Sequence, residues 1–144
     1  MRSLLDVNVL IALLDPDHSL HERAQRWWKA NSRFGWASCP ITENGFVRIL
    51  SNITNADGGR LSPHILIRDL SDFVLVSDHE FWPDDVSLLD EKIFARSKVI
   101  SAGAVTDIYL LALATIHIAR LVTFDTRIKR DSVIGSKDTN LCII

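Results

Sequence analysis

Short apolar runs alternate with longer segments of helical periodicity along this chain, and that alternation limits the folds it can adopt. Strands separated by helices usually run parallel in one sheet, and the helices then cover the faces of that sheet. We therefore expect an α/β fold with a parallel sheet flanked by helices. The expected strands are Ser3–Leu5, Gly35–Ser38, Glu80–Trp82, Leu121–Phe124 and Leu141–Ile144.

The expected helices follow from apolar stripes and from residues that start or stop a helix. Asn8 can cap a helix that ends at Leu14, because Asp15-Pro16 disfavours helical backbone. Ser19 and Glu22 have the spacing of a capping box. Further helices are expected from about Ser19 to Ala30, Pro40 to Ser51, Pro63 to Val76 and Val86 to Ala95, and after Gly103.

Length and composition indicate one folded domain spanning residues 1–144. The chain has 144 residues, of which 47% are hydrophobic, so about two thirds of the unfolded surface can be buried. No apolar run approaches the roughly 20 residues of a membrane helix, and the N-terminus lacks a signal-peptide pattern. We expect a cytoplasmic protein without a membrane segment. The net charge of -2 argues against a large phosphate-binding surface, but not against a nuclease whose acids hold metal.

Four acidic residues are predicted to lie at the same edge of the sheet. Asp6 and Asp125 directly follow two of the expected strands. Glu43 and Asp107 lie in the first turns of helices, and a helix that follows a strand begins at the carboxyl end of that strand. Ligands of parallel α/β sheets bind at this end. Both helical acids begin an otherwise apolar stripe; the stripes are Glu43, Phe46, Val47 and Leu50, and Asp107, Leu110, Leu111 and Ala114.

Carboxylates that lie close together destabilise the fold unless protons or cations neutralise their charges. Two of them about 4 Å apart repel by about 4 kcal/mol at an effective dielectric constant near 20, so a cluster takes up protons or binds cations. An oxygen-only site favours Mg²⁺ or Mn²⁺, and these ions commonly serve phosphoryl chemistry. Each acid alone has a structural alternative, because Glu43 and Asp107 also suit the positive end of a helix dipole.

Five segments, in order, carry a family resemblance: LLDVNVL at 4–10, TENGFVR at 42–48, FWPDD at 81–85, VTDIYLLALA at 105–114 and LVTFD at 121–125. On these segments the chain resembles the PIN-domain family, and within it most closely the VapC-like toxins of bacterial toxin–antitoxin pairs. The resemblance implies a three-layer fold with a central parallel five-stranded sheet. It also implies a Mg²⁺- or Mn²⁺-dependent endoribonuclease that cleaves RNA with a metal-activated water.

The resemblance extends to ligands and partners. Asp6, Glu43 and Asp107 match the core metal ligands of the family, and Asp125 matches a more variable fourth acid. We take these four as the catalytic and metal-binding residues. Family members commonly form homodimers and are inhibited by a cognate antitoxin whose C-terminal segment covers the site.

Polar residues beside the acids are candidates for weaker roles. Asn8, Thr106 and Thr123 each lie next to or near an acid and could orient it or a water, although Asn8 and Thr106 equally suit helix caps. Basic residues near the acids could contact the RNA backbone without selecting a sequence. These are Arg48, Arg127, Lys129 and Arg130.

Two other classes of protein remain alternatives. A receiver domain also has strand-end acids and Mg²⁺, but it needs an acidic pair after the first strand, and here Asp6 stands alone. A catalytically silent α/β module could keep the acids for metal or partner contacts. None of the five histidines has an evident catalytic or metal-binding partner in the sequence.

Overall fold

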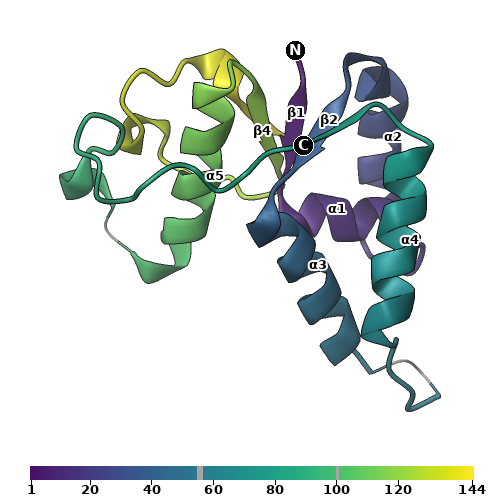
Figure 1. The fold of residues 1–144 in the computed structure, drawn as a ribbon. Coiled ribbons are helices and arrows are strands. Elements are labelled where there is room, and N and C mark those ends of the chain that lie inside the picture. Colours follow the sequence, from purple (N-terminus) through teal and green to yellow (C-terminus); the bar gives the residue numbers. More distant parts are fainter. Residues whose placement is uncertain (55–56, 100) are drawn as a thin grey trace.

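Five short parallel strands form the central sheet in the order β3-β2-β1-β4-β5. Strands β2, β1 and β4 are labelled in Figure 1. The computed structural model describes residues 1–54, 57–99 and 101–144. All four strand pairings are parallel, so the predicted parallel five-stranded α/β sheet is confirmed. The strands are β1 (Ser3–Leu5), β2 (Trp36–Ser38), β3 (His79–Phe81), β4 (Arg120–Thr123) and β5 (Leu141–Ile143).

Helices cover both faces of this sheet and make three layers (Figure 1). The longest strongly apolar helix, α5 (Val105–Ile116), packs on one face together with the irregular segment 82–99. No helix within the described ranges is long and apolar enough to cross a bilayer. The opposite face is covered by α1 (Val7–Leu14), α2 (His21–Asn31), α3 (Pro40–Asn52) and α4 (Pro63–Leu75).

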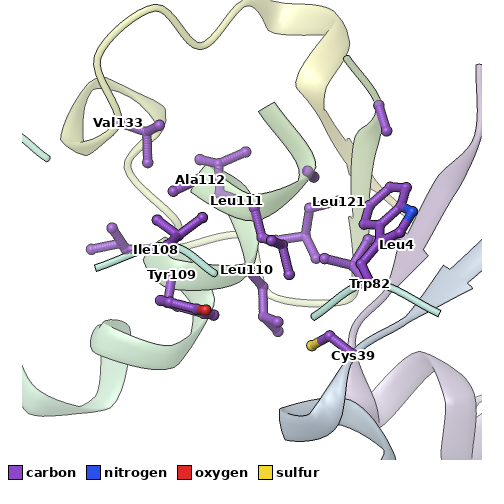
Figure 2. Packing of buried hydrophobic residues seen from close by; sticks show 14 of the residues in the cluster. Leu4, Cys39, Trp82, Ile108, Tyr109, Leu110, Leu111, Ala112, Leu121 and Val133 are labelled. Carbon is purple, nitrogen blue, oxygen red and sulfur yellow. The ribbon is translucent and has the colours of Figure 1, made fainter. Parts of the chain in front are cut away.

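Alternation along the central strands divides the interior into two cores. Leu4 and Leu121 point to the face that α5 covers, and their packing against that helix is seen in Figure 2. The next residues along each strand, Leu5 and Val122, point to the opposite face. This is the period of two expected for β-structure. The sheet is therefore buried on both sides, which explains why its strands read as continuous apolar runs.

Pro40 and Thr42 position the helix that carries Glu43. Pro40 is the first residue of α3, where its missing amide proton costs nothing. The hydroxyl of Thr42 accepts a hydrogen bond from the Cys39 amide at 3.0 Å and donates one to the Cys39 carbonyl at 3.0 Å. These contacts fix the turn between β2 and α3. Glu43 consequently stands at the carboxyl end of the sheet.

Two of the predicted helix caps, those of the first two helices, are wrong. The N-cap of α1 is Asp6 rather than Asn8, because the Asp6 carbonyl accepts the amides of Val9 and Leu10. Helix α2 begins at His21 after a turn, so the Ser19–Glu22 capping box does not form. The cause is the turn itself: the amide of His21 bonds the carbonyl of His18.

The predicted helix from Val86 to Ala95 is also wrong, because this segment consists of turns and irregular backbone. The side chain of Asp90 accepts the Lys92 amide at 2.9 Å, a local bond that competes with helix formation. Phe94 is buried, and its backbone forms an antiparallel bridge with Val133. Tertiary packing against residues beyond β4 therefore overrides the local helical pattern.

Candidate active site

Asp6 lies at the end of the central strand β1 and is only 4% exposed. Its Oδ2 accepts a hydrogen bond of 2.8 Å from the hydroxyl of Thr123, at the end of neighbouring β4. Burial raises the pKa of Asp6 above its ordinary value, although the Thr123 hydroxyl and the backbone amides of Val7 and Asn8 oppose the rise. Among the residues that the structure describes, no lysine or arginine pairs with Asp6, and a buried carboxyl in such surroundings is suited to bind a cation.

Asp107 is carried by α5, which packs on the face of the sheet opposite to α1. It lies in the first turn of α5, where the rest of its stripe is fully buried. The pKa of Asp107 is raised to about 6, first by burial and then by the charges of Asp6 and Asp125. The charge of Arg127 opposes this rise only in part. The charges of Asp6 and Asp125 thus act on the pKa of Asp107, and the charge of Asp125 also acts on that of Asp6.

Asp125 differs from the other acids because it has a positive partner of its own. The guanidinium of Arg127 donates to both of its carboxylate oxygens, at 3.0 Å and 2.7 Å. These bonds, together with the amide of Arg127, lower the pKa of Asp125 to about 2. The Asp125 amide in turn donates to the Thr123 hydroxyl at 3.0 Å. Thr123 thus joins Asp125 to Asp6.

Glu43 stands on the other side of β1, since strands β2 and β4 flank it and Glu43 follows β2. The hydroxyl of Ser38 donates to Oε1 of Glu43 at 2.6 Å. The same hydroxyl oxygen lies 2.8 Å from Nε2 of His79. Sequence reasoning missed Ser38 and His79. Only the position of Ser38 at a strand end, five residues before Glu43, could have indicated the first of these contacts.

Two cavities are lined by three of the four acids, and Asp6 lines neither of them. Asp107 and Asp125 line a cavity of about 290 Å³, together with the basic residues Lys98, Arg127 and Lys129. Glu43 lines a second, larger cavity of about 500 Å³ between α3, α4 and β3. The four predicted acids therefore occupy one edge of the sheet, but they do not share a single cavity.

The remaining predicted residues lie in varied surroundings. Asn8, Thr106 and Arg48 are exposed, and Thr106 does not cap α5, whose N-cap is Ala104. Lys129 is exposed at the first cavity. The side chain of Arg130 is already engaged, because it donates to the Ser136 carbonyl at 2.7 Å and pairs with Asp138 at 2.8 Å.

The donor set fits a hard divalent cation. Across the parts of the chain that the structure describes, no lysine or arginine lies within ion-pair distance of Asp6, Glu43 or Asp107. Within the same ranges, no group of three or more His, Cys, Asp or Glu side chains is placed so that it could hold a metal ion. Mg²⁺ does not require such a group, because it keeps several waters and binds proteins through one or two carboxylates. Asp6 and Asp107 are the acids whose raised pKa values such an ion would relieve.

Comparison with known proteins identifies the family. The family model described as the PIN domain matches residues 3–132. The chain belongs to the PIN-domain family. This membership removes the receiver-domain alternative.

Curated relatives of this PIN domain are ribonucleases by name. Ribonuclease VapC44 of Mycobacterium tuberculosis is 45% identical over 148 residues, covering 100% of both chains. Ribonuclease VapC39 of the same organism is 44% identical over 135 residues, covering 94% of this chain and 96% of its own. The similarity therefore extends over essentially the full length of these proteins.

Solved structures agree with the PIN-domain fold. VapBC2 from Rickettsia felis, bound to a DNA fragment from its promoter, matches with a TM-score of 0.60 at 12% identity, covering 100% of this chain and 98% of that one. FitAcB from Neisseria gonorrhoeae matches with a TM-score of 0.58 at 22% identity, covering 86% and 88%. At these identities the likeness supports the fold alone.

Proposed function

We propose that this PIN domain is a VapC-type endoribonuclease and the toxin of a VapBC-type toxin–antitoxin pair. The observation that carries the proposal is the full-length 45% identity to ribonuclease VapC44. The site supports it, because an edge of buried, mutually repelling carboxylates suits metal-assisted cleavage of a phosphodiester.

Asp6, Glu43, Asp107 and Asp125 would hold Mg²⁺ or Mn²⁺. When bound, the ion supplies an activated water and electrostatic stabilisation of the phosphate charge. Residues of the chain itself orient the acids and attract the substrate. Thr123 orients Asp6 by donating a hydrogen bond to its Oδ2. Lys129 borders the cavity of Asp107 and would attract the RNA backbone towards the acids. Lys98 borders the same cavity, but its ammonium is already paired with Asp131 at 2.6 Å.

Arg127 has a more restricted role than a free phosphate contact. Its guanidinium is held by Asp125, yet the side chain is 87% exposed. We propose that RNA phosphate competes with Asp125 for this guanidinium, which would release the carboxylate when substrate arrives. Arg48, Lys129 and Arg130 remain candidate contacts, with Arg130 the least available because of its bond to Asp138.

The partners that we propose are RNA as substrate, a cognate antitoxin protein as inhibitor, and a second copy of this chain in a homodimer. The antitoxin proposal is supported by the VapC names of the full-length relatives. An antitoxin segment that covers the carboxylate edge would exclude RNA directly.

Sequencing of RNA ends after induced expression tests activity and target together. The wild-type protein should produce new 5′ ends at defined positions, and Asp6→Asn should produce none while keeping its thermal transition. Asp17→Asn, which changes an exposed acid in a turn, is the matched control and should cleave normally. Equal cleavage by Asp6→Asn and wild type would contradict the proposal. Absence of cleavage and of Mn²⁺ binding in the wild type would favour the catalytically silent module.

A further inference from the structure

Ser38 and His79 form a hydrogen-bonded chain that ends on Glu43, and its direction can be assigned from the number of protons. Ser38 is the last residue of β2 and is 1% exposed. A serine hydroxyl has one proton, and here it is directed to Oε1 of Glu43 at 2.6 Å. The contact of 2.8 Å between the Ser38 oxygen and Nε2 of His79 therefore requires that Nε2 carries a proton and donates it.

The opposite direction is inconsistent with the role of Glu43. It would require a protonated carboxylic acid at Glu43 that donates to Ser38, whereas metal ligation needs the carboxylate. The assigned order is thus His79 Nε2–H to Ser38 Oγ, and Ser38 Oγ–H to Glu43 Oε1. Hydrogen bonds to an ionised acceptor are short and strong, in keeping with the 2.6 Å distance.

Packing holds the histidine in this orientation. Its ring lies against Trp36, with centroids 4.4 Å apart and planes inclined at 55°. Trp36 is itself fixed, since its indole nitrogen donates to the Ser77 hydroxyl at 2.9 Å. Burial lowers the pKa of His79 below its ordinary value, although the charge of Glu43 opposes this. A neutral ring with its proton on Nε2 meets every one of these constraints.

We propose that Ser38 and His79 are positioning residues that fix the carboxylate of Glu43, with one oxygen engaged by Ser38 and the other left for a ligand. The proposal rests on the proposed function, in which Glu43 is a metal ligand. It assigns a task to Glu43, which lines the second cavity rather than the cavity of Asp107 and Asp125. Partners of this kind typically change metal affinity or activity by about 10–100-fold.

Three substitutions separate positioning from structure. Ser38→Ala removes the donor to Glu43. His79→Phe keeps a ring against Trp36 but removes the N–H, whereas His79→Gln offers an amide N–H in its place. Ser3→Ala is the matched control, because Ser3 is an equally buried strand serine whose hydroxyl contacts Arg120 at the opposite end of the sheet.

Calorimetric titration of each variant with Mn²⁺, and kcat and KM for RNA cleavage, provide the readouts. Ser38→Ala should weaken Mn²⁺ binding about 10-fold and lower kcat with little change in KM. His79→Phe should act in the same direction, His79→Gln should recover much of the loss, and Ser3→Ala should bind Mn²⁺ like the wild type. Wild-type Mn²⁺ affinity in folded Ser38→Ala and His79→Phe would overturn the proposal.

Nitrogen NMR of the metal-free protein gives a test that needs no activity. The imidazole signals of His79, assigned by their loss in His79→Gln, should show the proton on Nε2. A neutral ring with the proton on Nδ1 would overturn the chain even if Ser38→Ala failed to fold. Glu43→Gln separates this proposal from the proposed function: if it loses Mn²⁺ binding while Ser38→Ala does not, only the positioning role fails. If Glu43→Gln retains full binding and cleavage, the ligand role of Glu43 itself is wrong.

Discussion

Asp107 and Asp125 both lie in the first cavity, but their surroundings push their pKa values in opposite directions. Burial and two neighbouring acids raise the pKa of Asp107 to about 6. The hydrogen bonds of Arg127 lower the pKa of Asp125 to about 2. One acid therefore changes its charge near physiological pH in the metal-free protein, whereas the other stays ionised.

This difference predicts that Mn²⁺ binding weakens as the pH falls through about 6. Asp107 then takes up a proton, which a metal must displace, whereas Asp125 remains charged. Calorimetric titrations between pH 5 and pH 7.5 in two buffers of different ionisation enthalpy should detect proton release at the lower pH. Identical Mn²⁺ affinity and no proton release across this range would contradict the assignment of Asp107 as a ligand.

A second prediction concerns the buried hydrogen bond between Thr123 and Asp6. Thr123→Val keeps the shape of the side chain but removes the donor at 2.8 Å, so the Asp6 carboxylate becomes more costly to bury. The free energy of unfolding should fall by about 1–3 kcal/mol at neutral pH, as measured by urea denaturation. Mn²⁺ affinity should fall as well. Thr115→Val removes a 2.7 Å bond within α5 and should affect stability alone.

At the scale of elements, α1 and α3 approach each other closely beside two of the acids. Gly45 on α3 is buried, and a Cβ at this position would lie 2.8 Å from Cγ2 of Val7. Val7 directly follows Asp6, and Gly45 lies two residues after Glu43. The small residue therefore allows the two acidic helix starts to approach each other.

Gly45→Ala should push these helices apart. We expect a loss of about 1–3 kcal/mol in the free energy of unfolding, with weaker Mn²⁺ binding in the protein that remains folded. Gly103→Ala is the matched control for stability, since a Cβ there meets nothing within 4 Å. Unchanged stability and Mn²⁺ affinity in Gly45→Ala would contradict this prediction, because they would show that Val7 can move aside at no cost.

At the scale of the molecule, the acids come from separate parts of the fold, so a bound metal should stabilise the whole. Asp6 and Asp107 belong to elements that pack into different cores. A ligand that binds only the folded state at 100 times its Kd adds about 2.7 kcal/mol to the free energy of unfolding. Mn²⁺ should therefore raise the Tm of the wild type and leave that of Asp6→Asn unchanged. An equal rise in both proteins would indicate binding elsewhere.

Much of this fold could be predicted from the sequence because its signals are periodic. The short apolar strands and the stripes of α3 and α5 follow from spacing alone, and strand connectivity places all four acids at one edge. The segment 86–95 could not be predicted in this way, since its structure depends on the bridge between Phe94 and Val133. Local pattern says nothing about so distant a contact.

The positions of the four acids at the carboxyl ends of the strands follow from connectivity, and their role as ligands stays a prediction. The contacts that support their side chains could not be predicted. The bond between Ser38 and His79 joins residues 41 positions apart on neighbouring strands, which no local spacing reveals. Arg127 illustrates a different limit. Its position two residues after Asp125 is compatible both with a free basic residue and with the pairing that forms, and only side-chain geometry distinguishes them.

The separation of the interior into two cores has a mechanical consequence. Helix α3 carries Glu43 on one face of the sheet and α5 carries Asp107 on the other, so the sheet separates the two acids (Figure 1). The distance between these two acids therefore depends on how thick the apolar packing is between each helix and the sheet. A bulkier or smaller core side chain beneath either helix would thus change the spacing of the acids, and with it the activity, without contacting them.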